Sequence, residues 1–234
     1  MTTMSRESLY TVGHSNQTQE DFLDLLRSQN INCIIEVISM PYSKYTPQFN
    51  SEVLKAFLKN EGILYAHFGE EFGARRTDCL KETIQKKKGA IITIQQVNFE
   101  LGIKTANFLH GAERVKKALS QGRCVSLMCS EADPLGCHRF SFISRFFYDL
   151  GWNVNHIMRC TETAKPILVD HKTLEQRMIM NYVSHKKLKS IGGQTQLLFS
   201  DFGDGYTEEQ QRIDAYRLKN QEIGWSPTTL EENQ

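Results

Sequence analysis

The residues best suited to chemistry lie together between positions 129 and 139. Cys129, Glu131, Cys137, His138 and Arg139 place two thiols, a carboxylate, an imidazole and a guanidinium in one short segment. An apolar run precedes the segment and a helix is predicted directly after it, so the unpaired N–H groups at the helix start would attract an anion and favour a thiolate. The pattern predicts that Arg139 binds an anionic group through its planar fork. His138 would then transfer protons, and Cys137 or Cys129 would act as the nucleophile or support it.

Two other hypotheses stay open for the same segment. In the first, the two cysteines are packed as small core hydrophobes and do no chemistry, while His138 and Arg139 are hydrogen-bonded to the backbone and to carboxylates. In the second, Cys129, Cys137 and His138 bind zinc, which takes four protein ligands or three plus a water molecule. The Cys-x7-Cys-His spacing is unusual for zinc, and His14 or His67 could complete such a site only through the fold. The enzyme hypothesis itself needs no cofactor.

Further candidates follow the other predicted strands. His14 lies in a turn between a strand and a helix, where it is either an acid–base group or a hydrogen-bonded turn residue. Ser15 and Asn16 beside it, Ser43 in a proline-containing loop and Glu70 after a third strand are candidates for substrate binding. Glu70 also has the alternative of being a solvated surface carboxylate.

Basic residues cluster at positions 75–76, 86–88 and 185–189. Each cluster taken singly is typical of a solvated face. Taken together, they could follow a nucleic-acid backbone while Tyr42, Tyr45 and Phe49 stack on bases. The sequence therefore also allows a nucleic-acid partner.

The elements that must position these residues alternate between strand and helix. Strands are predicted at residues 9–12, 33–38, 63–67, 124–128 and 154–157, with a further hairpin strand at 91–94. Helices are predicted from residue 18, from residue 50 or 51, and at 99–121, 140–150, 174–183 and 208–219. This order predicts an α/β fold, a mostly parallel open sheet with helices on both faces in a Rossmann-like three-layer arrangement, followed by a C-terminal helical extension. Ligands of such sheets bind at the carboxyl ends of the strands, so the loops at 13–16, 39–44, 68–71 and 129–139 should share one edge.

The whole chain has the composition of a globular protein. Its 234 residues are 40% hydrophobic and 24% charged, with a net charge of +1, which argues against a disordered chain and excludes a histone-like basic field. The six cysteines form no C-x-x-C pair, and no apolar stretch is long enough to span a membrane. We expect a cytoplasmic protein without a membrane partner, whose oligomeric state the sequence does not indicate. Residues 1–184 are predicted to form the α/β domain with the polar site, and residues 185–234 a basic joint and C-terminal helical appendage of the same unit.

Three motifs resemble a known family. They are Tyr-Thr-Val-Gly-His-Ser-Asn at residues 10–16, Pro-x-Ser at 41–43 with Pro-x-Phe-Asn at 47–50, and Cys-x-Glu-x-x-Pro-x-x-Cys-His-Arg at 129–139. In this order they resemble the bacterial family known as domain of unknown function 488. Residues 67–76 and 215–224 resemble the longer subgroup of that family.

The resemblance implies a compact α/β domain with a shared polar site, but no settled activity. It supports His14, Ser15, Asn16, Glu131, Cys137, His138 and Arg139 as site residues. One position departs from the family: Glu36-Val37-Ile38 stands where relatives usually have Asp-Val-Arg. If that arginine binds substrate in relatives, this chain binds a different substrate or binds more weakly; the alternative is a divergent or inactive member of the family.

Together these patterns predict an enzyme, a hydrolase or transferase with a Cys/His/Arg site. Its substrate would be anionic and contain phosphate, with nucleotides and nucleic acids among the candidates. The alternatives are a non-catalytic nucleic-acid-binding module and a metal-stabilised interaction domain that holds zinc.

Overall fold

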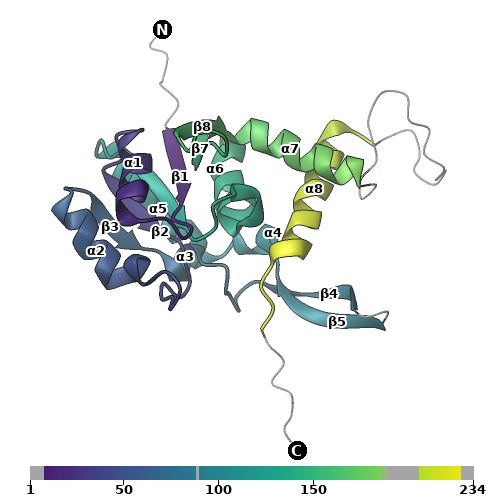
Figure 1. Cartoon of the computed structure of the whole chain (residues 1–234). Helices are drawn as coiled ribbons and strands as arrows, with labels where there is room; N and C mark the ends of the chain where they lie inside the picture. The colour runs from purple at the N-terminus through teal and green to yellow at the C-terminus, as the bar shows by residue number, and fades with distance from the viewer. Residues whose placement is uncertain (1–7, 88–89, 186–187, 189–205, 228–234) are drawn as a thin grey trace, which may run out of the picture.

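The computed structural model describes residues 8–87, 90–185, 188 and 206–227, and it describes no side chain between residues 85 and 91. Its main sheet has the strand order β3-β2-β6-β1-β7-β8, and β4 and β5 form a separate hairpin (Figure 1). The strands of the main sheet are β1 (Ser8–Gly13), β2 (Cys33–Glu36), β3 (Leu64–His67), β6 (Val125–Cys129), β7 (Asn153–Arg159) and β8 (Pro166–Asp170). The hairpin consists of β4 (Leu80–Lys87) and β5 (Ala90–Val97).

The main sheet is parallel except at one edge. β1 lies between β6 and β7, β2 lies between β6 and β3, and all of these pairs are parallel. The prediction of a mostly parallel α/β sheet is therefore confirmed. β8, which runs antiparallel to β7, was not predicted. Its apolar run is short and follows a proline, and Ile167 and Leu168 are 40% and 42% exposed, as at a sheet edge.

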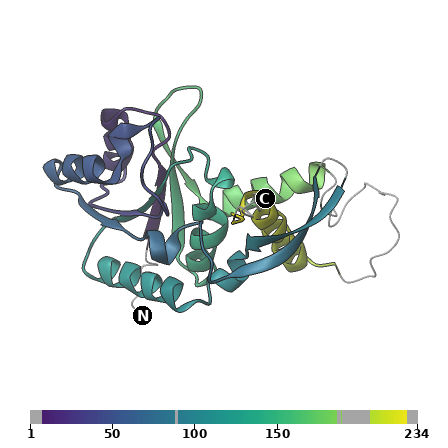
Figure 2. The ribbon, with the colours of Figure 1, turned by 90° about the horizontal axis from the view of Figure 1, so that it is seen from below.

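Helices cover both faces of the main sheet. The helices are α1 (Gln19–Arg27), α2 (Ser51–Asn60), α3 (Gly69–Phe72), α4 (Phe99–Gly102), α5 (Ala106–Ser120), α6 (Arg145–Asp149), α7 (His171–Ser184) and α8 (Glu208–Ile223). Three further segments, η1 (Pro47–Phe49), η2 (Pro134–Gly136) and η3 (Arg139–Ser144), have 3-10 or π-helical geometry. Figure 2 shows α1 and α2, in purple and blue, on the side of the sheet opposite to the teal α5.

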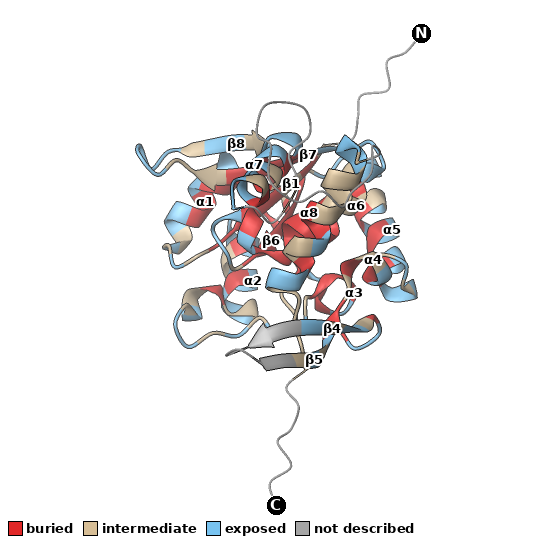
Figure 3. Ribbon diagram, turned by 90° about the vertical axis from the view of Figure 1, so that its right-hand side faces the viewer, coloured by how far each residue is buried: buried red, intermediate tan, exposed pale blue. Residues whose placement is uncertain are grey.

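Alternation along the strands builds a core on each face. Ile34 packs in one cluster with Phe22 of α1 and Leu54 of α2, whereas its neighbour Ile35 packs in another with Phe108 of α5. The buried residues therefore concentrate along the central strands and the helices next to them (Figure 3). Among the described residues, no helix combines the length and the apolar character that a membrane crossing requires.

The C-terminal helix adds a third core cluster. Tyr216 of α8 packs with Leu174 and Met178 of α7 and with Phe140 of η3. Asn220 ties α8 to the hairpin, because its Nδ2 donates to the Val97 carbonyl at 2.7 Å. The helix predicted at 208–219 is present and continues to Ile223. The division at residue 185 stays a prediction, and most of the predicted basic joint lies outside the described residues.

The segment after the cysteine–histidine motif differs from the predicted regular helix. Arg139–Ser144 is π-helical and only Arg145–Asp149 is α-helical. All six residues of the π-helical segment are buried, so their hydrophobic pattern has no polar face from which a helical period could be read. Such wide turns are common next to functional sites.

Candidate active site

Two loops from distant parts of the chain meet at the carboxyl edge of the sheet. Gly13 at the end of β1 is in register with Cys129 at the end of β6. Beyond the strands, the His14 N–H donates to the Cys129 carbonyl at 3.0 Å, and the Ser15 N–H donates to the Ser130 carbonyl at 2.8 Å. The predicted meeting of these segments at one edge is therefore present in the structure.

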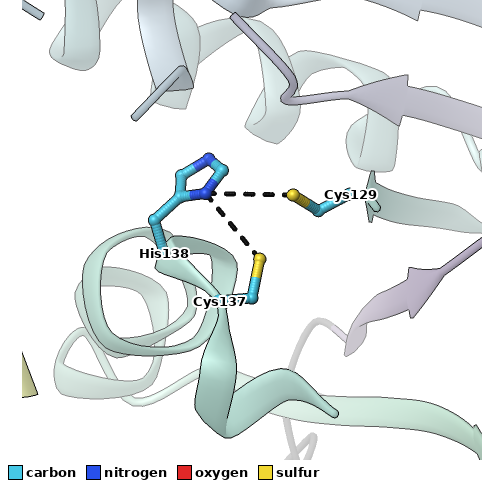
Figure 4. Close-up of side chains that lie close together, drawn as sticks. All are labelled: Cys129, Cys137 and His138. Atoms are coloured by element: carbon cyan, nitrogen blue, oxygen red, sulfur yellow. Dashed lines mark hydrogen bonds between the residues drawn. The ribbon is translucent and has the colours of Figure 1, made fainter. Parts of the chain in front are cut away.

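The centre of this edge is a buried cluster of two thiols and one imidazole. The Nδ1 atom of His138 lies 3.8 Å from the sulfur of Cys129 and 3.7 Å from that of Cys137 (Figure 4). The other ring nitrogen, Nε2, lies 3.1 Å from the Val37 carbonyl oxygen, to which it donates. Cys129, Cys137 and His138 are 3%, 2% and 7% exposed. The imidazole is thus fixed at one nitrogen and presents the other to both sulfurs.

Glu131 places a carboxyl group beside the cluster. The residue lies at the exposed rim, and the thiol of Cys129 donates to its Oε2 atom at 3.1 Å. The hydroxyl of Ser130 donates to the second oxygen at 3.1 Å. Burial of the carboxyl and the negative charge of Cys137 raise the pKa of Glu131. A carboxyl in this position can therefore hold a proton next to the thiols.

The two thiols differ in acidity. Burial raises the pKa of Cys137, but the interaction with Cys129 and the positive charges of Arg139 and His138 outweigh burial and hold that pKa well below its usual value. The interaction with Cys137, followed by burial, raises the pKa of Cys129. Burial lowers the pKa of His138, but the negative charge of Cys137 more than compensates and raises it. Cys137 is therefore the more acidic thiol of the pair.

Arg139 supports the loop that carries Glu131. Its side chain is fully buried, and its two terminal nitrogens donate to the carbonyls of Glu131 at 2.7 Å and Ala132 at 3.1 Å. Its backbone N–H donates to the sulfur of Cys137 at 3.4 Å. The Nε atom has no hydrogen-bond partner among the residues that the structure describes. Anion binding by Arg139 stays a prediction. In the structure, the two terminal nitrogens of its guanidinium group donate to main-chain carbonyls.

The predicted residues of the first turn reach this edge, and the imidazole of His14 contacts Ser15 and Phe49. Its Nδ1 lies 2.7 Å from the Ser15 carbonyl oxygen, and its ring stacks on Phe49 with centroids 4.3 Å apart. Burial lowers the pKa of His14. Ser15 has a left-handed backbone with φ of 50°, and its hydroxyl donates to the side chain of the exposed Asn16 at 3.3 Å.

Ser43 and Glu70 lie outside the cluster. The hydroxyl of Ser43 accepts from the backbone N–H groups of Tyr45 and Thr46 at 3.1 and 3.2 Å, so it stabilises its own loop. Glu70 is exposed and lines a cavity of about 800 Å³ beyond the ends of β2 and β3. Arg75 lines the same cavity. Whether Ser43 and Glu70 bind substrate stays a prediction.

One of the three aromatic residues predicted to stack on bases is buried. Phe49 is 3% exposed and stacks on His14, so it is not available to a base, whereas Tyr42 and Tyr45 are 71% and 96% exposed. Arg76 is buried and forms an ion pair with Asp78 at 2.6 Å. The lysine side chains at 86–88 and most of the cluster at 185–189 lie outside the described residues.

Main-chain carbonyls complete the site, and no sequence signal could have identified them. Val37 accepts from His138, and the next carbonyl, that of Ile38, accepts from Nε2 of His67 at 2.7 Å. The side chain of Ile38, at the position of the family's arginine, packs against the apolar core. The segment that leaves β2 therefore contacts the cluster through its backbone.

Comparison with known proteins gives one match. The model of the family described as domain of unknown function DUF488 matches residues 18–145, which is more than half of the chain. No curated protein and no solved structure matches the chain. With the cysteine–histidine–arginine motif inside the matched range, the chain belongs to the DUF488 family.

Proposed function

We propose that this protein is an enzyme, a hydrolase or group transferase, that acts on an anionic, phosphate-containing substrate. Its reaction centre is the cluster of Cys129, Cys137 and His138 together with Glu131. The observation that carries the proposal is the convergence of both thiols on one imidazole nitrogen, beside a carboxyl, at the carboxyl edge of the central strands. This edge is where open parallel sheets bind their ligands.

The environment of the cluster supports chemistry over simple packing. Cysteines that act as core hydrophobes need no polar neighbours. Here both sulfurs face a buried imidazole whose second nitrogen is held by the Val37 carbonyl, an arrangement that orients histidines for proton transfer or ligation. Burying the polar imidazole of His138 has a free-energy cost. A functional role would explain why the fold keeps a polar group at this position.

Glu131 is the proton-transfer group in this proposal. Its carboxyl reaches the thiol of Cys129 from the exposed rim, so a substrate that enters from solvent can meet it. Two positive groups support the choice of an anionic substrate. Arg139 donates to two main-chain carbonyls of the Glu131 loop, and the exposed Arg75 lines the cavity beyond the ends of β2 and β3.

The test measures turnover of phosphate compounds by the full chain. The probes are p-nitrophenyl phosphate, bis(p-nitrophenyl) phosphate, nucleoside 5′-phosphates, and single- and double-stranded oligonucleotides. We expect wild type to turn over at least one of them and Glu131→Gln to lose about 100-fold or more in kcat, because a positioned acid–base group contributes that much. Glu52→Gln, an exposed substitution on α2, is the matched control and keeps full turnover.

Two results would contradict the proposal. One is a wild-type protein that turns over none of these probes, and the other is a Glu131→Gln variant that is as active as Glu52→Gln. Oligonucleotide binding without turnover would favour a non-catalytic nucleic-acid-binding module instead. The salt dependence of that binding would identify contacts with the phosphate backbone.

A further inference from the structure

We propose that Cys129, Cys137 and His138 form a zinc site with one coordination position left open. The two sulfurs and one ring nitrogen all lie within 4.8 Å of one another, and the sulfur–nitrogen distances are 3.8 and 3.7 Å. Around a tetrahedral zinc with bonds of about 2.3 Å to sulfur and about 2.0 Å to nitrogen, these separations are roughly 3.5 to 3.8 Å. One ion can therefore lie at bonding distance from all three atoms after small movements.

The direction of the imidazole supports a metal over a hydrogen bond. A single N–H group points at one acceptor, but Nδ1 of His138 faces both sulfurs at nearly equal distances (Figure 4). Nε2 carries the proton that is donated to the Val37 carbonyl, so Nδ1 is the ring nitrogen that can bind a metal ion in place of a second proton. Histidines that bind metals almost always donate their second ring N–H in this way.

The backbone explains how two adjacent residues can ligate one ion. Successive side chains of an extended strand point in opposite directions. Cys137 is extended, with φ of −129° and ψ of 143°, but His138 is already helical, with φ of −60° and ψ of −24°. The change of backbone direction between them brings both side chains to the same side, toward Cys129 at the end of β6 (Figure 4). The unusual spacing in the sequence is therefore compatible with a single site.

The donor set selects the metal. Two sulfurs and an imidazole nitrogen are ligands that zinc prefers, whereas magnesium, calcium and manganese prefer oxygen ligands. The three donors belong to free cysteines and a histidine that are all buried, so water does not compete for them. Among the described residues, this is the group of histidine, cysteine and acidic side chains whose donor atoms converge closely enough for a metal ion.

Glu131 lies beside the proposed ligand Cys129 and is not one of the three converging donors. Its Oε2 is 3.1 Å from the sulfur of Cys129, but the carboxylate is not part of the mutually close group of donors. Sites with three protein ligands and an open position are typical of catalytic zinc, which activates a bound water molecule. This catalytic role rests on the proposed function, whereas metal binding itself does not.

The experiment measures metal content and cobalt spectra of the full chain. Protein purified under reducing conditions without chelator should contain about one zinc per chain by elemental analysis. Replacement by Co²⁺ should give the visible absorption of a tetrahedral site and sulfur-to-cobalt charge-transfer bands. We expect Cys129→Ser, Cys137→Ser and His138→Gln each to weaken zinc binding by roughly 10-fold or more. Cys160→Ser, a partly exposed cysteine outside the cluster, is the matched control and keeps the metal.

The outcomes separate this inference from the proposed function. Less than about 0.1 zinc per chain, with no zinc or cobalt uptake by reduced wild type, overturns the metal site even if folding of the variants fails. In that case a loss of turnover in Glu131→Gln would still support the enzyme. If zinc is bound at one per chain and Glu131→Gln changes neither metal content nor turnover, the metal site stands and the proposed function fails. Glu131→Gln with full zinc and lost turnover supports both.

Discussion

Gly13 shows how one residue without a side chain permits the site. A Cβ atom at this position would lie 1.8 Å from the Glu131 carbonyl oxygen and 3.1 Å from a terminal nitrogen of Arg139. The same carbonyl oxygen accepts from Arg139, so the loop cannot move away without losing that hydrogen bond. The backbone of Gly13 does not have a positive φ. Glycine is therefore required at this position because a side chain would not fit, and not because of the backbone conformation. The absence of a side chain on β1 lets the loop after β6 hold Glu131 next to the thiols.

We expect Gly13→Ala to destabilise the protein by about 2 kcal/mol or more, because the methyl group collides with backbone that Arg139 holds in place. Gly136→Ala is the matched control: its Cβ would meet no atom of the described part of the chain within 4 Å. That control should change stability by less than about 0.5 kcal/mol. Urea unfolding followed by circular dichroism measures both variants. Equal unfolding midpoints for the two variants would show that the loop after β6 can move away from the methyl group without a loss of stability.

At the scale of elements, a buried chain of hydrogen bonds joins β1, β7, α7 and α8. Tyr216 donates to Glu175 at 2.8 Å, so it must accept from Nε2 of His171 at 2.9 Å. His171 then accepts at Nδ1 from Nε2 of His156 at 3.2 Å, and His156 accepts from the hydroxyl of Thr11 at 2.8 Å. The direction of donation assigns a neutral tautomer to each histidine. A proton added to Nδ1 of His171 would place two donors face to face, because Nε2 of His156 already donates to that atom.

Stability should therefore fall in acid. Burial lowers the pKa of His171 to about 3 and that of His156 well below its usual value. The arginines Arg212 and Arg145 also disfavour a proton on His171, against the opposing charge of Asp170. In the unfolded chain a histidine titrates near 6.5, so between about pH 6.5 and 3 the unfolded state binds more protons and unfolding becomes easier as pH falls.

We expect His171 alone to remove about 2 kcal/mol of stability between pH 8 and pH 5. The free energy of unfolding in urea should depend less steeply on pH for His171→Gln than for wild type, because the variant lacks the His171 contribution. The acidic groups are common to both proteins and cancel in the difference. The ring-proton NMR shift of His171 should stay that of a neutral imidazole down to pH 5. A titration of His171 centred near 6.5 would be inconsistent with the buried chain.

At the scale of the whole molecule, α8 joins parts of the chain that the sequence separates widely. Arg212 donates to Glu175 of α7 at 2.7 Å and also pairs with Asp149 of α6. Asn220 accepts from the Phe99 N–H at 2.7 Å while donating to the hairpin. The C-terminal helix therefore packs against α6, α7 and the hairpin, and it covers Phe140 in the segment after His138.

The chain should unfold in a single cooperative transition, because α8 shares buried contacts with α6, α7 and the hairpin. Calorimetric and van't Hoff enthalpies should agree in differential scanning calorimetry. Asn220→Ala should lower the free energy of unfolding by roughly 1–3 kcal/mol, because the Phe99 N–H and the Val97 carbonyl lose their hydrogen-bond partner. Two resolved transitions in wild type would instead show that the C-terminal region folds as a separate domain.

The predicted part of the fold depends on local patterns. Continuous apolar runs at β2 and β6 predicted buried parallel strands, and Thr18 predicted the start of α1, where its hydroxyl accepts from the Asp21 N–H at 3.1 Å. The π-helical segment and β8 were missed, because neither a fully buried helix nor a short edge strand has a distinctive pattern.

The sequence by itself determined the order of most of the elements, the family and the segment in which the two thiols, the carboxyl and the imidazole gather, because hydrophobic period and motif are properties of neighbouring residues. Only the tertiary structure decided what each side chain faces. His138 meets both sulfurs, His14 turns to Phe49, and the fork of Arg139 binds carbonyls. These contacts join segments far apart in the chain, and several use main-chain groups that every residue carries, so no local pattern encodes them.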